Sequence, residues 1–295
     1  LLEEAAIDGI PALVIDPKGD IANLALTFPQ LRPEDFKRWV DAGEAARKGQ
    51  SVDEFASATA TTWRKGLEEW GEDGERIQRL RDAAVVDIYT PGSNAGRPLS
   101  ILRSFAAPDP VVANDATAFK ERVGSAVAGL LGLLGVDADP IRSREFILLS
   151  ALLDAAWRQG ESLDLAALIR SVQKPPFENV GVFDVESFFP AKDRTELALR
   201  INGLLASPGF EAWLAGDALD IQSLLYDANG KPRIAIISIA HLNDAERMFV
   251  VTLVTNELVA WMRRQSGTTS LRAIFYMDEV FGFFPPSAMP PSKLP

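Results

Sequence analysis

The sequence predicts an α/β fold in which a mostly parallel sheet carries a large all-helical insertion. Four short runs rich in apolar residues occur at 11–15, 84–89, 233–239 and 273–277. Apolar runs of this length are typical of strands buried on both faces of a parallel sheet. Long helical patterns separate the runs, as in proteins that alternate strands with helices.

The first 107 residues contain the first two predicted strands. A helical pattern at the start of the chain ends at Gly9 and Pro11. This pattern is the back half of a helix without a front half, so we expect the chain to be a fragment. Residues 33–83 form a charged helical insertion between the two strands. Its expected core anchors are Trp39, Phe55, Trp63 and Trp70.

Residues 108–226 form the predicted all-helical subdomain. Helical patterns occupy 120–134, 144–157, 163–172 and 195–205. This block is larger than a helical crossover between neighbouring strands, so we interpret it as an insertion. Its aromatic residues are expected in the core, because its cations are dispersed and do not alternate with aromatic residues as a base-stacking surface requires.

Residues 227–295 form the second part of the predicted sheet domain. They contain the strands at 233–239 and 273–277, and a helix over 243–264 joins them. Asn243 is the expected N-cap of that helix. The sheet domain is therefore predicted in two pieces, 1–107 with its helical insertion at 33–83 and 227–295, on either side of the helical subdomain.

Composition excludes several classes of site. The chain has 295 residues, a net charge of −11, no cysteine and one histidine, His241. Disulfides, thiolate metal sites and thiol catalysis are therefore excluded, and a histidine-rich metal site or a Ser-His-Asp triad is disfavoured. The negative charge argues against a broadly basic, DNA-coating surface, but it leaves room for a local track of cations. A hydrogen-bonded structural role is favoured for His241.

The longest apolar stretch is too short to span a membrane. Val123 to Val136 covers about 14 residues, and a spanning helix needs roughly 20. The glycines within this stretch predict close packing between helices. Nothing resembles a signal peptide, so we expect a soluble, cytoplasmic protein with no membrane partner.

Two carboxylates end the last predicted strand. Asp278 and Glu279 follow the apolar run 273–277, and Pro285-Pro286 prevents a regular element from continuing. Open α/β sheets bind ligands at the carboxyl ends of their strands. The arrangement matches the Walker B pattern, in which Asp278 serves a nucleotide-bound Mg²⁺, directly or through water, and Glu279 polarises the attacking water. An ordinary strand followed by acidic loop residues is the alternative.

The first predicted strand ends in a similar way. Asp16, Lys18 and Asp20 follow residues 11–15, and Gly19 permits a tight turn and a close approach to a ligand. These residue types are also the commonest turn formers, so a plain turn is the alternative. If both acidic strand ends belong to one site, Asp16 and Asp278 must lie at the same edge of one parallel sheet.

A P-loop ATPase also needs the motif G-x-x-x-x-G-K-[ST], which this chain lacks. The fragment Gly230-Lys231 is followed by Pro232 and has Leu225 where the first glycine should stand. Five segments nevertheless resemble the HerA/FtsK-type ATPases of the P-loop superfamily, and most of all a bacterial HerA-like ATP-binding group with a helical insertion. They are VIDPKGD (14–20), SREFILLSALLDAAWR (143–158), VGVFDVESFFPAKDR (180–194), ISIAHLNDAERMFVV (237–251) and YMDEVFGFFPP (276–286).

The resemblance implies a RecA-like P-loop NTPase sheet that is truncated at both ends. The phosphate loop would precede Leu1, and a sensor segment would follow Pro295. It also implies ATP and Mg²⁺ as cofactors, with Asp16, Lys18 and Asp20 near the nucleotide. Such proteins are motors, helicases or translocases on double-stranded DNA, usually homo-oligomeric rings that are often hexameric, in some cases with a partner nuclease. A neighbouring subunit supplies an arginine to the transferring phosphate; Arg247 and Arg272 are candidates by location alone.

Two other functions remain open from the sequence. The first is a nucleotide-dependent scaffold or switch ATPase that moves little DNA. The second is a non-motor α/β enzyme that uses the two acidic strand ends as a metal site. Glu279 after Asp278 favours hydrolysis, because a module that only binds a nucleotide needs no catalytic base.

Overall fold

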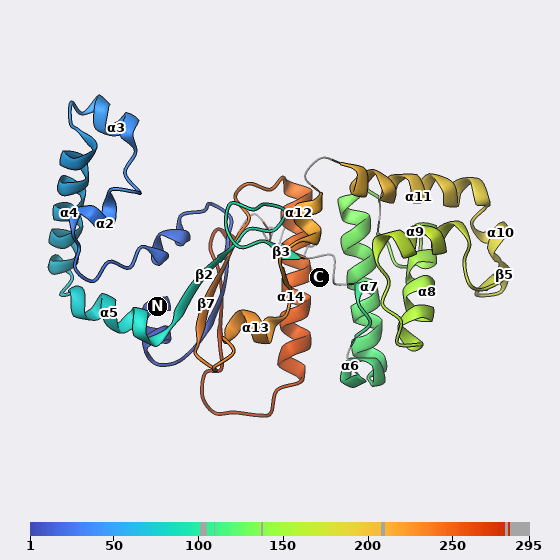
Figure 1. Ribbon diagram of the computed structural model, residues 1–295. Coiled ribbons are helices and arrows are strands. Elements are labelled where there is room, and N and C mark those ends of the chain that lie inside the picture. Colours follow the sequence, from blue (N-terminus) through green and yellow to red (C-terminus); the bar gives the residue numbers. More distant parts are fainter. Residues whose placement is uncertain (101–104, 109, 137, 208–209, 281–282, 284–295) are drawn as a thin grey trace, which may run out of the picture.

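A four-stranded, all-parallel sheet organises the protein in the computed structural model (Figure 1). The structure describes residues 1–100, 105–108, 110–136, 138–207, 210–280 and 283. The strand order is β2-β7-β1-β8. The strands are β1 (Ala12–Asp16), β2 (Val85–Tyr89), β7 (Arg233–Ser238) and β8 (Ile274–Met277). The predicted α/β class with a mostly parallel sheet is confirmed.

The two faces of the sheet are buried against different helices. All five residues of β1 are buried, as a central strand with an unbroken apolar run requires. One face, with Val14 and Ile236, packs against the helices α1 (Leu2–Ile7) and α5 (Gly74–Ala83). The other face, with Leu13 and Ile237, belongs to the large core that continues into the helical part of the chain.

Residues between β1 and β2 form a helical arm at one end of the molecule (Figure 1). It contains the short 3-10 helix η1 (Ile21–Ala25) and the helices α2 (Pro33–Phe36), α3 (Ala42–Arg47), α4 (Val52–Glu69) and α5. The arm has a small core of its own, built on Leu31, Phe36, Ala56 and Ala60.

Two of the predicted anchors of this arm are wrong. The side chain of Trp39 is 65% exposed and that of Trp70 is 86% exposed. Small alanines of α4 allow α2 to approach closely, so Phe36 fills the space between the helices. Trp63 covers this core from outside, with its ring edge-to-face against Phe36 at a centroid distance of 5.5 Å.

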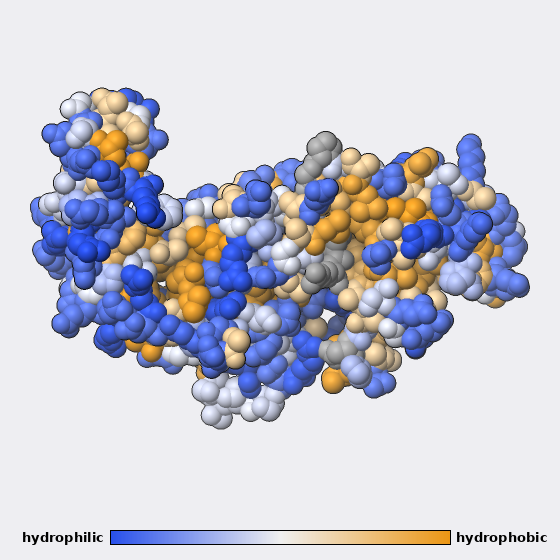
Figure 2. Space-filling view, in the orientation of Figure 1, coloured by the Kyte–Doolittle hydropathy of each residue, from blue (hydrophilic) through white to orange (hydrophobic). Residues whose placement is uncertain are grey.

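The helical part between β2 and β7 shares its core with the sheet. Its helices are α6 (Pro110–Asn114), α7 (Ala116–Leu133), α8 (Arg144–Arg158), α9 (Leu165–Gln173), α10 (Val185–Phe188), α11 (Ala191–Ala206), α12 (Glu211–Leu214) and α13 (Ile221–Leu225). Buried side chains run without interruption from β1 and β7 through α14 (Asp244–Arg263) and α7 to α8, α9 and α11. In the orientation of Figure 2, hydrophobic residues gather over the middle of this helical part, whereas the arm is largely hydrophilic.

Two short strand pairs in this region were not predicted. β3 (Leu99–Ser100) pairs in parallel with β6 (Asp217–Ala218), and β4 (Asn179–Val180) forms an antiparallel hairpin with β5 (Phe183–Asp184). Each strand has two residues, which is too short for a periodic pattern in the sequence.

The long helix α14 joins β7 to β8 and covers the sheet. Its N-cap is Asn243, as predicted, whose side chain accepts a hydrogen bond from the Glu246 amide while the Glu246 side chain bonds back to the Asn243 amide. Among the described residues, no helix combines the length and apolar character needed to cross a lipid bilayer.

Candidate functional site

The predicted site residues lie at the carboxyl ends of two adjacent strands, with Asp16 as the last residue of β1. In the strand register, Asp16 pairs with Ser238 at the end of β7, and Ile15 pairs with Met277 at the end of β8. Asp278 and Glu279 therefore leave the sheet at the same edge as the turn that follows Asp16. This is the edge at which parallel α/β sheets bind their ligands.

The turn after β1 is built around the carboxylate of Asp16. The Gly19 amide donates a hydrogen bond of 2.7 Å to Asp16 Oδ1. Gly19 has a φ of +84°, and a Cβ there would lie 3.4 Å from the Cβ of Ala240. Glycine is thus favoured both by the backbone conformation and by the neighbouring loop.

Asp16 itself lies inside the fold. Its residue exposure is 0%, and its Oδ2 atom is buried without a hydrogen-bond partner among the described residues. Lys18 and Asp20 are exposed on the same turn. A ligand at this edge therefore meets Lys18 and Asp20 first, and the geometry suits Asp16 to shaping the turn.

An ion pair joins the two acidic strand ends. The Lys18 ammonium donates a hydrogen bond to Glu279 Oε1, across 261 positions of sequence. The hydrogen bond to Glu279 and the charge of Glu279 raise the pKa of Lys18 above its usual value, with smaller contributions from the charges of Asp278 and Asp20. The structure therefore brings together Lys18, Asp20, Asp278 and Glu279.

Glu279 has a left-handed backbone with a φ of +52°. This conformation is uncommon for a residue with a side chain, and such outliers cluster at active sites and switch regions. It occurs here at Glu279, for which the Walker B pattern predicts a catalytic role.

Hydrogen bonds of two side chains hold the loop after β7 in place. Arg247 donates hydrogen bonds to the carbonyls of Ile239 at 3.2 Å and Ala240 at 2.8 Å. His241 Nε2 lies 2.8 Å from the Pro91 carbonyl, in the loop after β2. This contact is of the hydrogen-bonded kind that the sequence favoured for His241. Arg247 braces the loop that packs against Gly19.

Arg272 lies away from this edge. It precedes β8, so it is at the opposite end of the strand from Asp278. Its guanidinium donates to the Ser266 carbonyl. The structure therefore engages both arginines that the sequence singled out with backbone carbonyls of their own chain.

The donor set at the edge fits a Mg²⁺-bound nucleotide. Asp278 and Glu279 are partly exposed, and Lys18 and Asp20 are exposed. Within the described part of the chain, no three His, Cys, Asp or Glu side chains converge as a self-contained metal site. Mg²⁺ commonly binds through one or two carboxylates and completes its shell with water and phosphate oxygens. The acidic side chains at this edge can supply those carboxylates.

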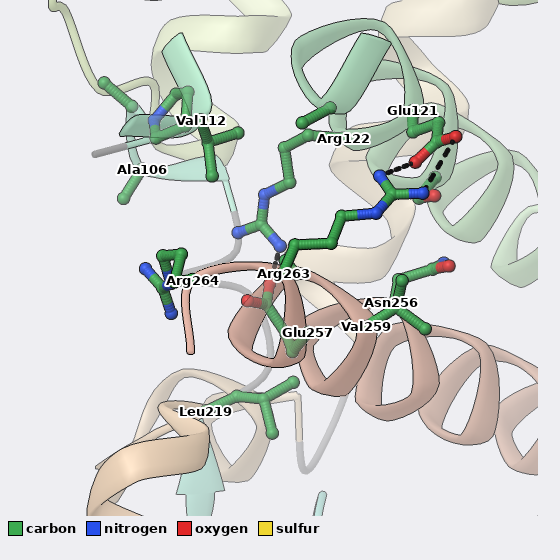
Figure 3. Close-up of a pocket in the computed structure, with 15 residues that line it drawn as sticks. Ala106, Val112, Glu121, Arg122, Leu219, Asn256, Glu257, Val259, Arg263 and Arg264 are labelled. Atoms are coloured by element: carbon green, nitrogen blue, oxygen red, sulfur yellow. Dashed lines mark hydrogen bonds and ion pairs between the residues drawn. The ribbon is translucent and has the colours of Figure 1, made fainter. Parts of the chain in front are cut away.

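A second polar cluster, which the sequence did not suggest, lies between α7 and α14 (Figure 3). It lines a cavity of about 240 Å³. Arg122 of α7 pairs with Glu257 of α14, and Arg263 of α14 pairs with Glu121 of α7. These reciprocal ion pairs connect the helical part to the helix that covers the sheet. Their members lie more than a hundred residues apart, so no local pattern reveals them.

Comparison with known proteins found no protein-family model, no curated protein and no solved structure that matches this chain. The functional argument therefore rests on the chemistry at the edge of the sheet.

Proposed function

We propose that this chain is the catalytic core of an ATP hydrolase of the HerA/FtsK type that drives translocation on double-stranded DNA. The observation that supports the proposal is the convergence of Lys18 and Asp20 with Asp278 and Glu279 at the carboxyl edge of one parallel sheet. Two loops that only connect strands to the next elements do not require a lysine and three acids at the one edge where parallel sheets bind ligands.

Each residue has a distinct role in this proposal. Asp278 holds Mg²⁺, directly or through water, and Glu279 accepts a hydrogen bond from the attacking water and orients it. Lys18 and Asp20 face the phosphates and their metal, and Asp16 holds the turn that carries them. Bound Mg²⁺ would neutralise charge on the phosphates during transfer. The chain contains no G-x-x-x-x-G-K-[ST], so the proposal requires a phosphate loop from outside residues 1–295.

The test is ATP hydrolysis by the natural protein that contains this chain, measured with and without linear double-stranded DNA. We expect Mg²⁺-dependent turnover that DNA stimulates and that Glu279→Gln lowers on the order of 10²-fold or more. Turnover or ATP-driven assembly that ignores DNA would favour the scaffold or switch function. A protein that binds no Mg-ATP would contradict the proposal.

A further inference from the structure

The ion pair between Lys18 and Glu279 engages an ammonium and a carboxylate that the proposed reaction requires to be free of each other. A carboxylate that receives a hydrogen bond from an ammonium is a weaker acceptor for a water proton. An ammonium paired with a carboxylate is likewise less available to a phosphate oxygen. In the structure both are engaged with each other.

The ion pair between Lys18 and Glu279 can open with little loss of stability. The side chain of Lys18 is 54% exposed and that of Glu279 is 31% exposed. Ion pairs in such contact with water contribute little to stability and are screened by salt. Lysine is also a flexible point charge, which can change partners without a fixed hydrogen-bond geometry.

The left-handed backbone of Glu279 adds to this arrangement. Residues in this region of φ and ψ persist only where their surroundings hold them. The ammonium of Lys18 is one such restraint on the Glu279 side chain. Removal of the ammonium therefore frees the carboxylate and relaxes one restraint on its backbone.

We propose that Glu279 holds Lys18 in the nucleotide-free site, and that the phosphates of a bound nucleotide take Lys18 away from it. Binding then exposes the Glu279 carboxylate to water only when a nucleotide is in place. This inference rests on the proposed function, and it assigns to Lys18 a second role as a latch on the catalytic carboxylate. A triphosphate carries more negative charge than one carboxylate, so the exchange is electrostatically favourable.

A double-mutant cycle on nucleotide affinity tests the latch. The probe is Mg²⁺ with a non-hydrolysable ATP analogue, titrated calorimetrically into the natural protein that contains this chain. The variants are Glu279→Ala, Lys18→Met and the double substitution. Asp244→Asn is the matched control, because it removes one negative charge from the exposed start of α14, beside the same edge, at a residue with no role in the proposed site.

We expect Glu279→Ala to tighten binding by about fivefold or more relative to Asp244→Asn, because the freed lysine is available to the phosphates. In the Lys18→Met background, Glu279→Ala should add no more than the Asp244→Asn effect. An equal effect of Glu279→Ala in both backgrounds would overturn the latch, since it would report charge repulsion alone. If the wild type binds no nucleotide, the proposed function fails and the latch fails with it. All three side chains are partly or fully exposed, and thermal unfolding curves establish that each variant is folded.

Discussion

Gly129 of α7 lies so close to Phe249 of α14 that a Cβ at Gly129 would stand 2.8 Å from the Phe249 ring. This contact is part of the surface on which the helical part meets the helix covering the sheet. The glycines of the stretch 123–136 were predicted to allow close helix packing, which Gly129 bears out and Gly132 and Gly135 do not, because a Cβ at either would meet no heavy atom within 4 Å. Gly124 of the same helix differs, because a Cβ there would lie 3.8 Å from the Phe146 ring, an ordinary contact distance.

The first prediction uses this difference. Gly129→Ala should lower the free energy of unfolding by about 1–3 kcal/mol, because the new methyl group overpacks the interface. Gly124→Ala should instead raise it by up to about 1 kcal/mol, because alanine is the better helix former. Urea unfolding followed by circular dichroism measures both. Destabilisation of similar size in the two variants would refute the close contact between α7 and α14.

The strands of the sheet could be predicted because each one has a local sequence pattern, a short run rich in apolar residues. β1 and β7 are continuous apolar runs, and burial between two layers of helices explains that composition. β8 is an apolar run as well, but its residues are only partly buried or exposed, because it lies at an edge of the sheet. The acids at their ends could be found for the same reason, because a polar residue directly after a buried run marks the edge of the sheet. The start of α14 could be predicted as well, because Asn243 is a typical N-cap residue.

The contacts within the site could not be predicted in this way. The Lys18–Glu279 pair joins positions 261 residues apart, and strand order, which the sequence does not state, decides whether they meet. The burial of Asp16 was also missed, because an aspartate before Pro-Lys-Gly reads as an exposed turn. The opposite error was made at Trp39 and Trp70. Their large apolar side chains were expected to be buried, and both are exposed.

The second prediction separates the roles of the two carboxylates in the natural protein. Glu279→Gln keeps the shape of the side chain and removes the charge that orients water, so ATP binding should persist. Turnover should fall on the order of 10²-fold or more. Asp278→Ala should weaken Mg-ATP binding itself. Steady-state kinetics and calorimetry distinguish the two, and equal, mild effects of both substitutions would indicate a structural pair of acids.

The third prediction concerns DNA. With a net charge of −11, the proposed translocase should contact DNA through only a few cations, which a homo-oligomeric ring would gather into its channel. Binding should therefore require assembly, and it should weaken with salt in proportion to the few phosphates contacted. Fluorescence anisotropy over a salt series, on separated monomers and oligomers, gives both quantities. Tight binding by monomers that is insensitive to salt would be incompatible with this picture.

The fourth prediction concerns residues 1–295 produced alone. β8 lies at an edge of the sheet, and no strand within the described residues pairs with its outer side. Phe275 of β8 is 40% exposed and the preceding Leu271 is 60% exposed. An apolar edge of this kind pairs readily with another chain, so we expect self-association at high concentration. Phe275→Lys should suppress it, as seen by sedimentation velocity, and Trp70→Lys on the arm should leave it unchanged.

The same chain should bind no Mg-ATP in a calorimetric titration. Asp278, Glu279 and Asp20 are all negative, and they repel a triphosphate unless cations and backbone amides oppose them. Lys18 contributes a single positive charge, which it must first release from Glu279, so by itself it offsets little of that repulsion. A phosphate loop at a helix N-terminus supplies the missing amides and a lysine, and this chain contains no such motif. Micromolar binding by residues 1–295 would mean that the phosphates are held by other residues of this chain, and the loop would then not be required.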